Sequence, residues 1–306
     1  MSIIQYKASN MVEGSTISIS DELREKLITE WEAIGISNDF VFCKVMQDES
    51  LLRGLLERIL PNLDVTSIEV EQQKSIEIGM DIHGVRFDIY ATLIDGTVVD
   101  IEMQMVNTGS LPRRMRYYGS VADIQMLEKS ISYDDLQDQY VIMICPFDLF
   151  GQGRHIYTFR KRCVESTELE LDDGTTSIVL NASGILDDIS NDLKAFLDYV
   201  AGKEVDDDYV RKLDAAVTRA KLNKRWRAEY MIASAWVMDH EIIGRQKGLE
   251  EGRQIGIEEG RQEIISAMLR NGKTPREIAD FCGYPIELVN RIQENMPVKE
   301  SCTDGV

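Results

Sequence analysis

Apolar residues recur at helical spacing in the first part of the chain. Between Ser20 and about Ile34 they fall three or four positions apart, which is typical of an amphipathic helix. Two more helices are predicted between Val41 and Leu60, the second with the sequence SLLRGLLERIL. Residues 1–17 show no clear period, so no element is predicted there.

The middle of the chain changes to a strand pattern. TSIEVEQQ (66–73) is strand-like, residues 86–106 predict a hairpin, residues 111–129 a helix, and QYVIMIC (139–145) a further strand. Because QYVIMIC is an unbroken apolar run, we expect it to be covered on both faces of its sheet. This order of elements predicts an α/β fold with a mixed central sheet flanked by helices.

The remainder of the chain is expected to be mostly helical. LELDDGTTSIVL (169–180) first predicts a second hairpin, with Asp173 and Gly174 at its turn. Residues 188–240 then have the pattern of helices with charged exposed faces. An all-α C-terminal extension is therefore predicted.

A glycine repeat marks this extension. Glycine returns at every fourth residue from Gly244 to Gly260, and Gly-Arg-Gln at every eighth. Each glycine inside a helix costs about 1 kcal/mol relative to alanine, so the repeat needs a reason. Close helix–helix approach, a flexible linker and sequence duplication are the three explanations that the sequence leaves open.

The tail after the repeat predicts three short helices, EIISAMLRNG, TPREIADFCG and PIELVNRIQ. Thr274 is the expected N-cap of the middle helix, with Pro275 at its first position and Glu277 completing a capping box. The spacing is similar to that of a helix-turn-helix, although a three-helix tail that only packs on itself fits equally well.

The hairpin RFDIYATLIDGTVVDIEMQ allows two registers. A two-residue loop of Asp95 and Gly96 pairs Ile94 with Thr97 and mixes acids with hydrocarbon on each face. A three-residue loop, with Gly96 left-handed as a bulge, pairs Leu93 with Thr97 instead.

The three-residue loop gives two consistent faces. The apolar face then holds Phe87, Ile89, Ala91, Leu93, Val99, Ile101, Met103 and Met105, and the polar face Asp88, Tyr90, Thr92, Asp100, Glu102 and Gln104. Because a one-residue slip moves every side chain to the opposite face, the apolar pattern selects this register.

This register places Asp88 opposite Glu102, with Cβ atoms roughly 5 Å apart. Like charges at this distance need a cation, a shared proton or open water. A divalent cation also offers chemistry, because it can orient a water and stabilise charge on a phosphate oxygen. The alternative is a solvent-exposed face, as in many antiparallel sheets. Asp100 shares the face but lies about 7 Å farther along the strand, so we expect it to support the pair rather than join it.

The charge balance restricts the function classes. A net charge of −19 argues against a protein that coats nucleic acid non-specifically, because such binding depends on Lys and Arg. Residues 211–227 nevertheless form a local basic segment, with seven Lys and Arg against one Asp, and Arg113, Arg114 and Arg116 form a smaller one.

Cysteine, histidine and hydropathy exclude other classes. The five cysteines and three histidines are scattered and predict neither a disulfide framework nor a zinc site, so any metal should be held by oxygen atoms. No run approaches about 18 apolar residues, and the N-terminus lacks a signal-peptide pattern, so neither a membrane span nor secretion is predicted. The protein is therefore expected to be cytoplasmic.

One predicted strand has an acid near its start, and the next antiparallel strand has an acid, any residue and a lysine-like residue in succession. This pattern resembles that of the PD-(D/E)xK nuclease superfamily. Here these positions are Asp88, Glu102 and Gln104. The recombination-promoting nuclease, or transposase-like, family of that superfamily is similar over nearly the whole chain from about residue 37. The similar segments are NDFVFCKVM (38–46), the hairpin, Arg116-Tyr117-Tyr118, SIVLNASG (177–184) and the glycine-repeat tail.

The resemblance implies a restriction-endonuclease-like core and a DNA endonuclease that depends on magnesium, with manganese as an alternative. Asp88 and Glu102 would hold the metal, together with the main-chain carbonyl of Met103. Gln104 stands where the superfamily has lysine, but it is neutral and cannot offset an anionic transition state as an ammonium group would. More of that stabilisation must then come from the metal or from arginine.

Arg113, Arg114 and Arg116 are assigned to phosphate contact. They lie near the start of the helix after the hairpin, where helix-terminal N–H groups also favour an anion. The competing interpretation is a nuclease-fold protein with weak or no catalysis that binds DNA or protein through its helical tail. That tail also offers a route to a homo-oligomer.

The chain is accordingly divided into six segments. They are an N-terminal segment with one helix (1–36), a nuclease-like core (37–200), a helical basic region (201–243), a glycine-repeat helix or linker (244–262), a small helix-turn-helix-like tail (263–296) and a disordered end (297–306).

Overall fold

The computed structural model describes residues 21–72, 75–76, 85–128 and 132–296. The expectations for residues 1–17 and 297–306 lie outside the described residues. The chain divides after Ala233 into two compact units, and each is described by itself.

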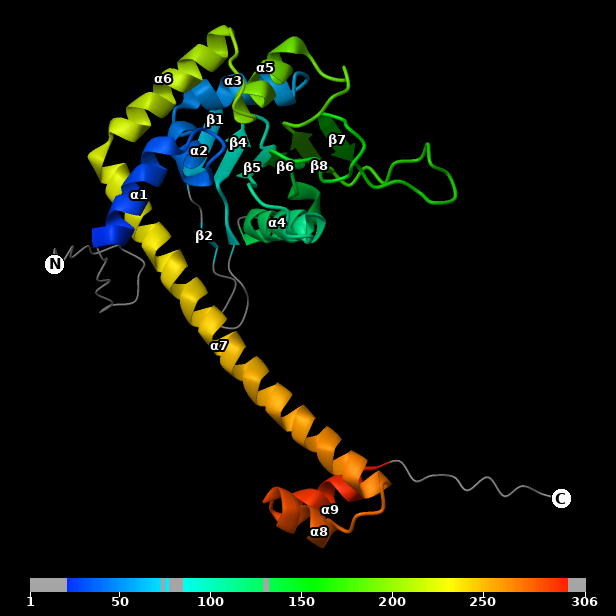
Figure 1. Cartoon of the computed structure of the whole chain (residues 1–306). Coiled ribbons are helices and arrows are strands. Elements are labelled where there is room, and N and C mark those ends of the chain that lie inside the picture. Colours follow the sequence, from blue (N-terminus) through cyan, green and yellow to red (C-terminus); the bar gives the residue numbers. More distant parts are fainter. Residues whose placement is uncertain (1–20, 73–74, 77–84, 129–131, 297–306) are drawn as a thin grey trace. The chain divides into compact units, whose positions relative to one another are not determined.

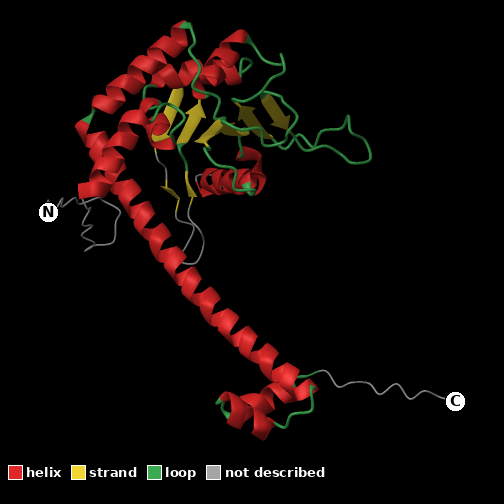
Figure 2. Cartoon of the chain, viewed as in Figure 1, coloured by secondary structure: helices red, strands yellow, loops and turns green. Residues whose placement is uncertain are grey.

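The first unit is built on a six-stranded mixed sheet (Figure 2). Its order is β1-β4-β5-β6-β8-β7. The strand bounds are β1 (Ile68–Gln72), β4 (Ile89–Leu93), β5 (Val98–Met103), β6 (Gln139–Cys145), β8 (Thr175–Asn181) and β7 (Ile156–Phe159). β5, β6 and β8 are parallel to one another, and β1, β4 and β7 pair antiparallel. A separate antiparallel pair joins β2 (Ser75–Ile76) to β3 (Val85–Arg86).

Helices cover both faces of the sheet, which confirms the α/β prediction (Figure 1). One face carries α1 (Asp21–Ala33), α2 (Asp39–Val45), α3 (Glu49–Ile59), α5 (Asn191–Val200) and α6 (Asp208–Leu222). The opposite face carries α4 (Leu111–Glu128), which a short 3-10 turn, η1 (Tyr133–Asp135), follows. As predicted, residues 139–145 form a strand that is buried along nearly all its length.

Local sequence explains where the helices on the first face begin. Their N-caps are Asn38, Asp48, Ser190 and Asp207, and each side chain accepts a hydrogen bond from a main-chain N–H of the first turn. Such caps satisfy donors that have no partner inside a helix. The apolar stripes behind them pack on Ile89, Ala91 and Ile101 to form the largest core.

The β4–β5 hairpin has the predicted three-residue loop. Ile89 is paired with Ile101 and Thr92 with Val98. The N–H of Leu93 donates to the carbonyl of Thr97 at 2.9 Å, and Gly96 has a φ of 90°. The apolar pattern therefore selected the correct register.

The predicted faces of this hairpin are wrong at their ends. Phe87 is predicted beside Ile89 but packs against Tyr90 and Tyr118 on the other face, with ring centroids 5.2 and 5.5 Å away. Strand alternation does not extend to Phe87, because β4 begins only at Ile89. Met105 follows the end of β5 and is 43% exposed.

The second predicted hairpin is also wrong. β8 pairs with β6 and β7, and the carbonyl of Gly174 accepts the N–H of Gln139 at 2.9 Å. The residues before Asp173 fold back on an earlier segment instead, where the N–H of Leu171 donates to the carbonyl of Lys161 at 2.9 Å. The Asp-Gly pair thus precedes a parallel strand and does not turn a hairpin.

The second unit contains most of α7 (Lys224–Arg270), a helix of 47 residues. The glycine repeat lies inside it, and the first of the three predicted tail helices is its last part rather than a separate helix. No helix-breaking signal occurs before Gly272, whose φ is 83°.

The other two tail helices are present as α8 (Pro275–Cys282) and α9 (Ile286–Glu294). The predicted capping box of Thr274 and Glu277 is confirmed. A small core closes this unit, formed by Ile265, Ile278, Val289 and Ile292.

Replacing Gly96 should test the register. Gly96→Ala is expected to destabilise the protein by about 1–2 kcal/mol, because an L side chain is strained at this φ and its Cβ would lie 2.9 Å from Gln137 Oε1. Gly35→Ala, where nothing lies within 4 Å, serves as the control in urea unfolding. Equal stability of the two variants would contradict the three-residue loop.

Candidate active site

Asp88 and Glu102 meet at the end of the hairpin away from its turn. Asp88 directly precedes β4, and Glu102 is the penultimate residue of β5. The N–H of Asp88 donates to Glu102 Oε1 at 2.9 Å, and the N–H of Met103 donates to Asp88 Oδ2 at 3.1 Å. Main-chain donors therefore fix each carboxylate beside the other, so the predicted juxtaposition is confirmed.

The acidic face of the hairpin is buried. Asp100 is 1% exposed and Glu102 is 3% exposed. Helix α4 packs over this face, where Val121 and Ala122 form a core with Tyr90. The alternative of a solvent-exposed acidic face is therefore wrong for Asp100 and Glu102.

Burial changes the protonation of these acids. It raises the pKa of Asp100 well above the usual range, and the charges of Glu102 and Asp88 raise it further. Burial and then the charge of Asp88 raise the pKa of Glu102 to about 8, against the opposing effects of the Asp88 N–H and of Arg114. Burial therefore favours the protonated forms of Asp100 and Glu102.

Arg114 of α4 is the cation inside this site. Its Nη1 donates to Gln104 Oε1 at 2.5 Å, and its Nη2 lies 3.3 Å from Glu102 Oε2. Nη2 also donates to the Tyr118 hydroxyl at 3.1 Å, one helical turn farther along α4. The structure thus brings Arg114 together with the three residues of the motif, whereas the sequence distinguished it from its neighbours by no signal.

The other two predicted arginines do not join the cluster. Arg113 and Arg116 are exposed on α4. Arg113 is one residue before Arg114 and Arg116 is two residues after it, so both point away from the side of Arg114, because one residue advances the helix by about 100°. Only Arg114 has the position that faces the hairpin.

Helix α2 contributes a thiol that no sequence motif indicated. Cys43 is buried beside Asp88. Burial, followed by the charges of Asp88 and Asp39, raises the pKa of this thiol far above its usual range. Cys43 therefore lines the site as an uncharged thiol.

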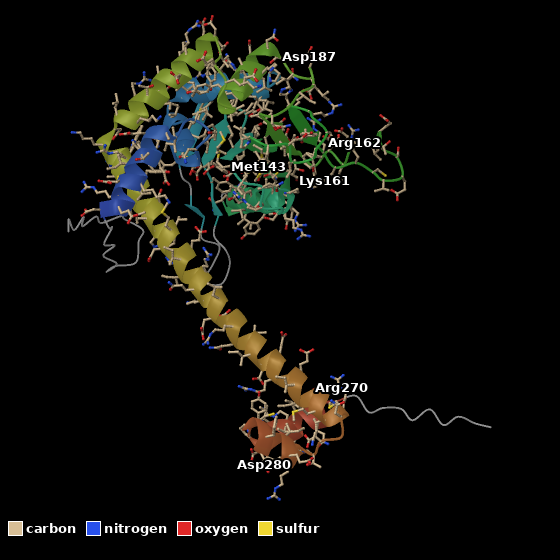
Figure 3. All side chains as sticks on the ribbon, viewed as in Figure 1. Met143, Lys161, Arg162, Asp187, Arg270 and Asp280 are labelled. Atoms are coloured by element: carbon tan, nitrogen blue, oxygen red, sulfur yellow. The ribbon has the colours of Figure 1, made fainter. Side chains whose placement is uncertain are left out.

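Two exposed cationic side chains of the first unit lie outside the hairpin and α4. Lys161 and Arg162 lie on the segment between β7 and β8 (Figure 3). Lys161 pairs with Asp173 at 2.5 Å and Arg162 with Glu170 at 2.7 Å. These ion pairs within one segment leave little free positive charge there.

The chemistry of the cluster fits a divalent cation. Asp88, Asp100 and Glu102 face the single charge of Arg114, so full ionisation leaves an excess of negative charge. Carboxylate oxygens are the donors that magnesium and manganese prefer, and an oxygen that accepts one hydrogen bond keeps a further lone pair. Among the described residues, no set of three or more His, Cys, Asp or Glu side chains is arranged to hold a metal, so the candidate cation site depends for side-chain ligands on the pair Asp88 and Glu102 alone.

A mixed sheet with helices on both faces and an acidic pair at a hairpin end defines a nuclease-like fold. Residues 36–181 match the family model of the PD-(D/E)XK nuclease family transposase. The match includes both Asp88 and Glu102 as well as Gln104 and Arg114. Neither curated proteins nor solved structures gave a match to the chain.

This match supports a nuclease-like function for the matched region. None of the helices in the described ranges has a stretch apolar enough to cross a membrane.

The metal-free protein should lose stability as the pH rises. The folded-state pKa values of Asp100 and Glu102 lie above their unfolded values, so the contribution of both acids to stability is present at low pH and falls as the pH rises; for Glu102 it is lost between about 4.5 and about 8. We expect urea titrations in EDTA to show a fall on the order of a few kcal/mol across this window.

Asp100→Asn should flatten this pH dependence, because the amide does not titrate. The exposed Asp187→Asn should leave the slope unchanged. A slope that is as steep in Asp100→Asn as in the wild type would rule out the assigned role of burial.

Proposed function

We propose that the protein is a divalent-metal-dependent endonuclease that hydrolyses phosphodiester bonds in DNA, with magnesium or manganese as the ion. The observation that carries this proposal is the pair Asp88 and Glu102, which main-chain hydrogen bonds hold together beside a single guanidinium group. The nuclease family of residues 36–181 supports the same chemistry.

The residues have separate roles in this proposal. Asp88 and Glu102 hold the ion, and the carbonyl of Met103 is a further ligand. When bound, the ion supplies Lewis acidity toward a phosphate oxygen and lowers the pKa of a nearby water. In the hydrolysis, the water oxygen would bond to phosphorus as the bond to the opposite ester oxygen breaks, the water would lose a proton to solvent, and the departing oxygen would take one up. Arg113 and Arg116, exposed on α4, contact phosphates on either side of the cleaved bond.

The basic segment at 211–227 is weaker than its sequence suggests. Arg211 pairs with Asp206 and Asp208, and Arg225 pairs with Glu229 at 3.0 Å. Each pair removes charge that would otherwise attract phosphates. DNA contact through this segment is therefore expected to be weak and sensitive to salt.

Removing either carboxylate should stop DNA cleavage. Asp88→Asn and Glu102→Gln should each lower plasmid nicking in magnesium or manganese by about 100-fold or more, because both hold the ion. Asp187→Asn, an exposed aspartate of the same unit, should cut at the wild-type rate. Wild-type nicking by both site variants would show that another part of the chain is responsible.

A second candidate function is self-association through the C-terminal unit. Helix α7 exposes Leu249 by 66%, Ile255 by 58% and Ile257 by 50%. At each glycine from Gly244 to Gly260, nothing lies within 4 Å of a Cβ built there. Exposed apolar side chains beside open glycines support close approach of another helix.

DNA recognition by the helix-turn-helix-like tail has less support. Residues 263–296 carry four Lys and Arg against five Asp and Glu. Binding along phosphates requires a basic surface, and this composition does not provide one. We therefore place self-association ahead of DNA contact for this unit.

Polar substitutions on α7 should weaken self-association. The double variant Leu249→Lys, Ile257→Lys should raise the dissociation constant about tenfold or more, because it removes apolar area from the contact. Lys247→Gln, an exposed change on the same helix, is the control in light scattering across a concentration series. A wild-type protein that stays monomeric at every concentration would exclude this second function.

A further inference from the structure

Gln104 stands at the lysine position of the motif, but its amide is occupied at both ends. Gln104 Nε2 donates to the carbonyl of Val106 at 2.8 Å, and Oε1 accepts Arg114 Nη1 at 2.5 Å. The amide orientation follows from chemistry, because a guanidinium has only donors and must therefore meet the amide oxygen. Gln104 has no charge, and one N–H of its amide is already donated to Val106, so it cannot supply positive charge to a reacting phosphate.

Arg114 carries the positive charge that Gln104 lacks. Its side chain is 35% exposed, whereas that of Glu102 is 3% exposed, so the guanidinium lies between the buried acids and solvent. It also lies 5.3 Å from the centre of the Tyr118 ring, which limits its motion.

A guanidinium group has five N–H donors, and three of them meet Gln104, Glu102 and the Tyr118 hydroxyl. Among the described residues, nothing else accepts a hydrogen bond from this group. Its remaining donors have the planar geometry that suits a phosphate.

We propose that Arg114 supplies the positive charge at the reacting phosphate, and that Gln104 is the positioning residue that holds Arg114 there. This inference rests on the proposed nuclease function. It separates two tasks that one lysine performs in the motif: the strand residue fixes the position, and a residue of α4 carries the charge.

The same geometry predicts that Arg114 opposes metal binding. Its Nη2 lies 3.3 Å from Glu102 Oε2, one of the oxygens that would hold the ion. Two cations at one carboxylate repel each other. Removing the arginine charge should therefore strengthen metal binding while it weakens contact with DNA.

Stronger metal binding together with weaker DNA contact distinguishes the proposed role of Arg114 from a structural one. Arg114→Gln keeps donors for Glu102 and Tyr118 but removes the charge. We expect it to bind magnesium about tenfold more tightly by calorimetry, because one cation is removed from beside Glu102. Its nicking rate should fall about 100-fold.

Arg114→Lys keeps the charge and should retain more activity than Arg114→Gln. Adding Gln104→Lys to the Arg114→Gln variant should restore part of the nicking that the single variant loses, because the lysine returns a cation to the motif position. Arg24→Gln removes one charge from an exposed site on α1 and should match the wild type in both assays. Thermal unfolding of each variant checks that a change in either assay does not come from loss of the fold.

The outcomes distinguish the two proposals. A wild-type protein that never cuts DNA overturns the nuclease function, yet calorimetry with magnesium still tests whether Arg114 opposes the ion. If the wild type cuts and Arg114→Gln cuts equally well, the role of Arg114 is wrong while the nuclease function stands. Parallel loss of metal binding and cleavage in Arg114→Gln would reduce Arg114 to a structural residue and would also overturn the inference.

Discussion

Two carboxylates that repel each other are held side by side by main-chain hydrogen bonds, and the geometry of the site depends on this constraint. The N–H of Asp88 binds Glu102, and the N–H of Met103 binds Asp88, so each strand positions the acid of the other. These bonds form in only one register, which requires Gly96 at a φ of 90°. The turn at one end of the hairpin therefore determines the chemistry at the other end.

Helix α4 both creates and moderates the electrostatic cost of this arrangement. It covers the acidic face and so raises the pKa of Asp100 and Glu102. The same helix supplies Arg114, whose charge lowers that cost without cancelling it. A fold that retains an unfavourable charge balance is stabilised by any cation that binds the folded state alone. Stability and ion binding are thus linked through one helix.

The sequence predicted the parts that depend on simple periodicity. Alternation along residues 89–93 and 99–103 was enough to select the hairpin register, and the run at 139–145 was enough to identify a doubly covered strand. Alternation failed at Phe87, because the strand had not yet begun. The Asp173-Gly174 turn failed for a different reason, since Asp-Gly signals a turn but does not say which strands it joins.

The site was predictable only along the strands. The positions of Asp88 and Glu102 follow from the hairpin register. Their neighbours lie on helices, and tertiary packing decides which side of each helix faces the hairpin. Arg114, Arg113 and Arg116 look alike in sequence, and only the packing of α4 distinguishes them. Likewise, nothing in the spacing of α2 places Cys43 beside Asp88.

This buried thiol gives the protein an internal reporter of its own site. A thiolate is the form that reacts with alkylating reagents, and Cys43 is kept as a thiol by burial and by the charge of Asp88. Its reactivity therefore depends on how often α2 separates from the hairpin and on the charge that Asp88 carries at that moment. Events at the acidic pair can be followed at a native sulfur atom, without introducing a label.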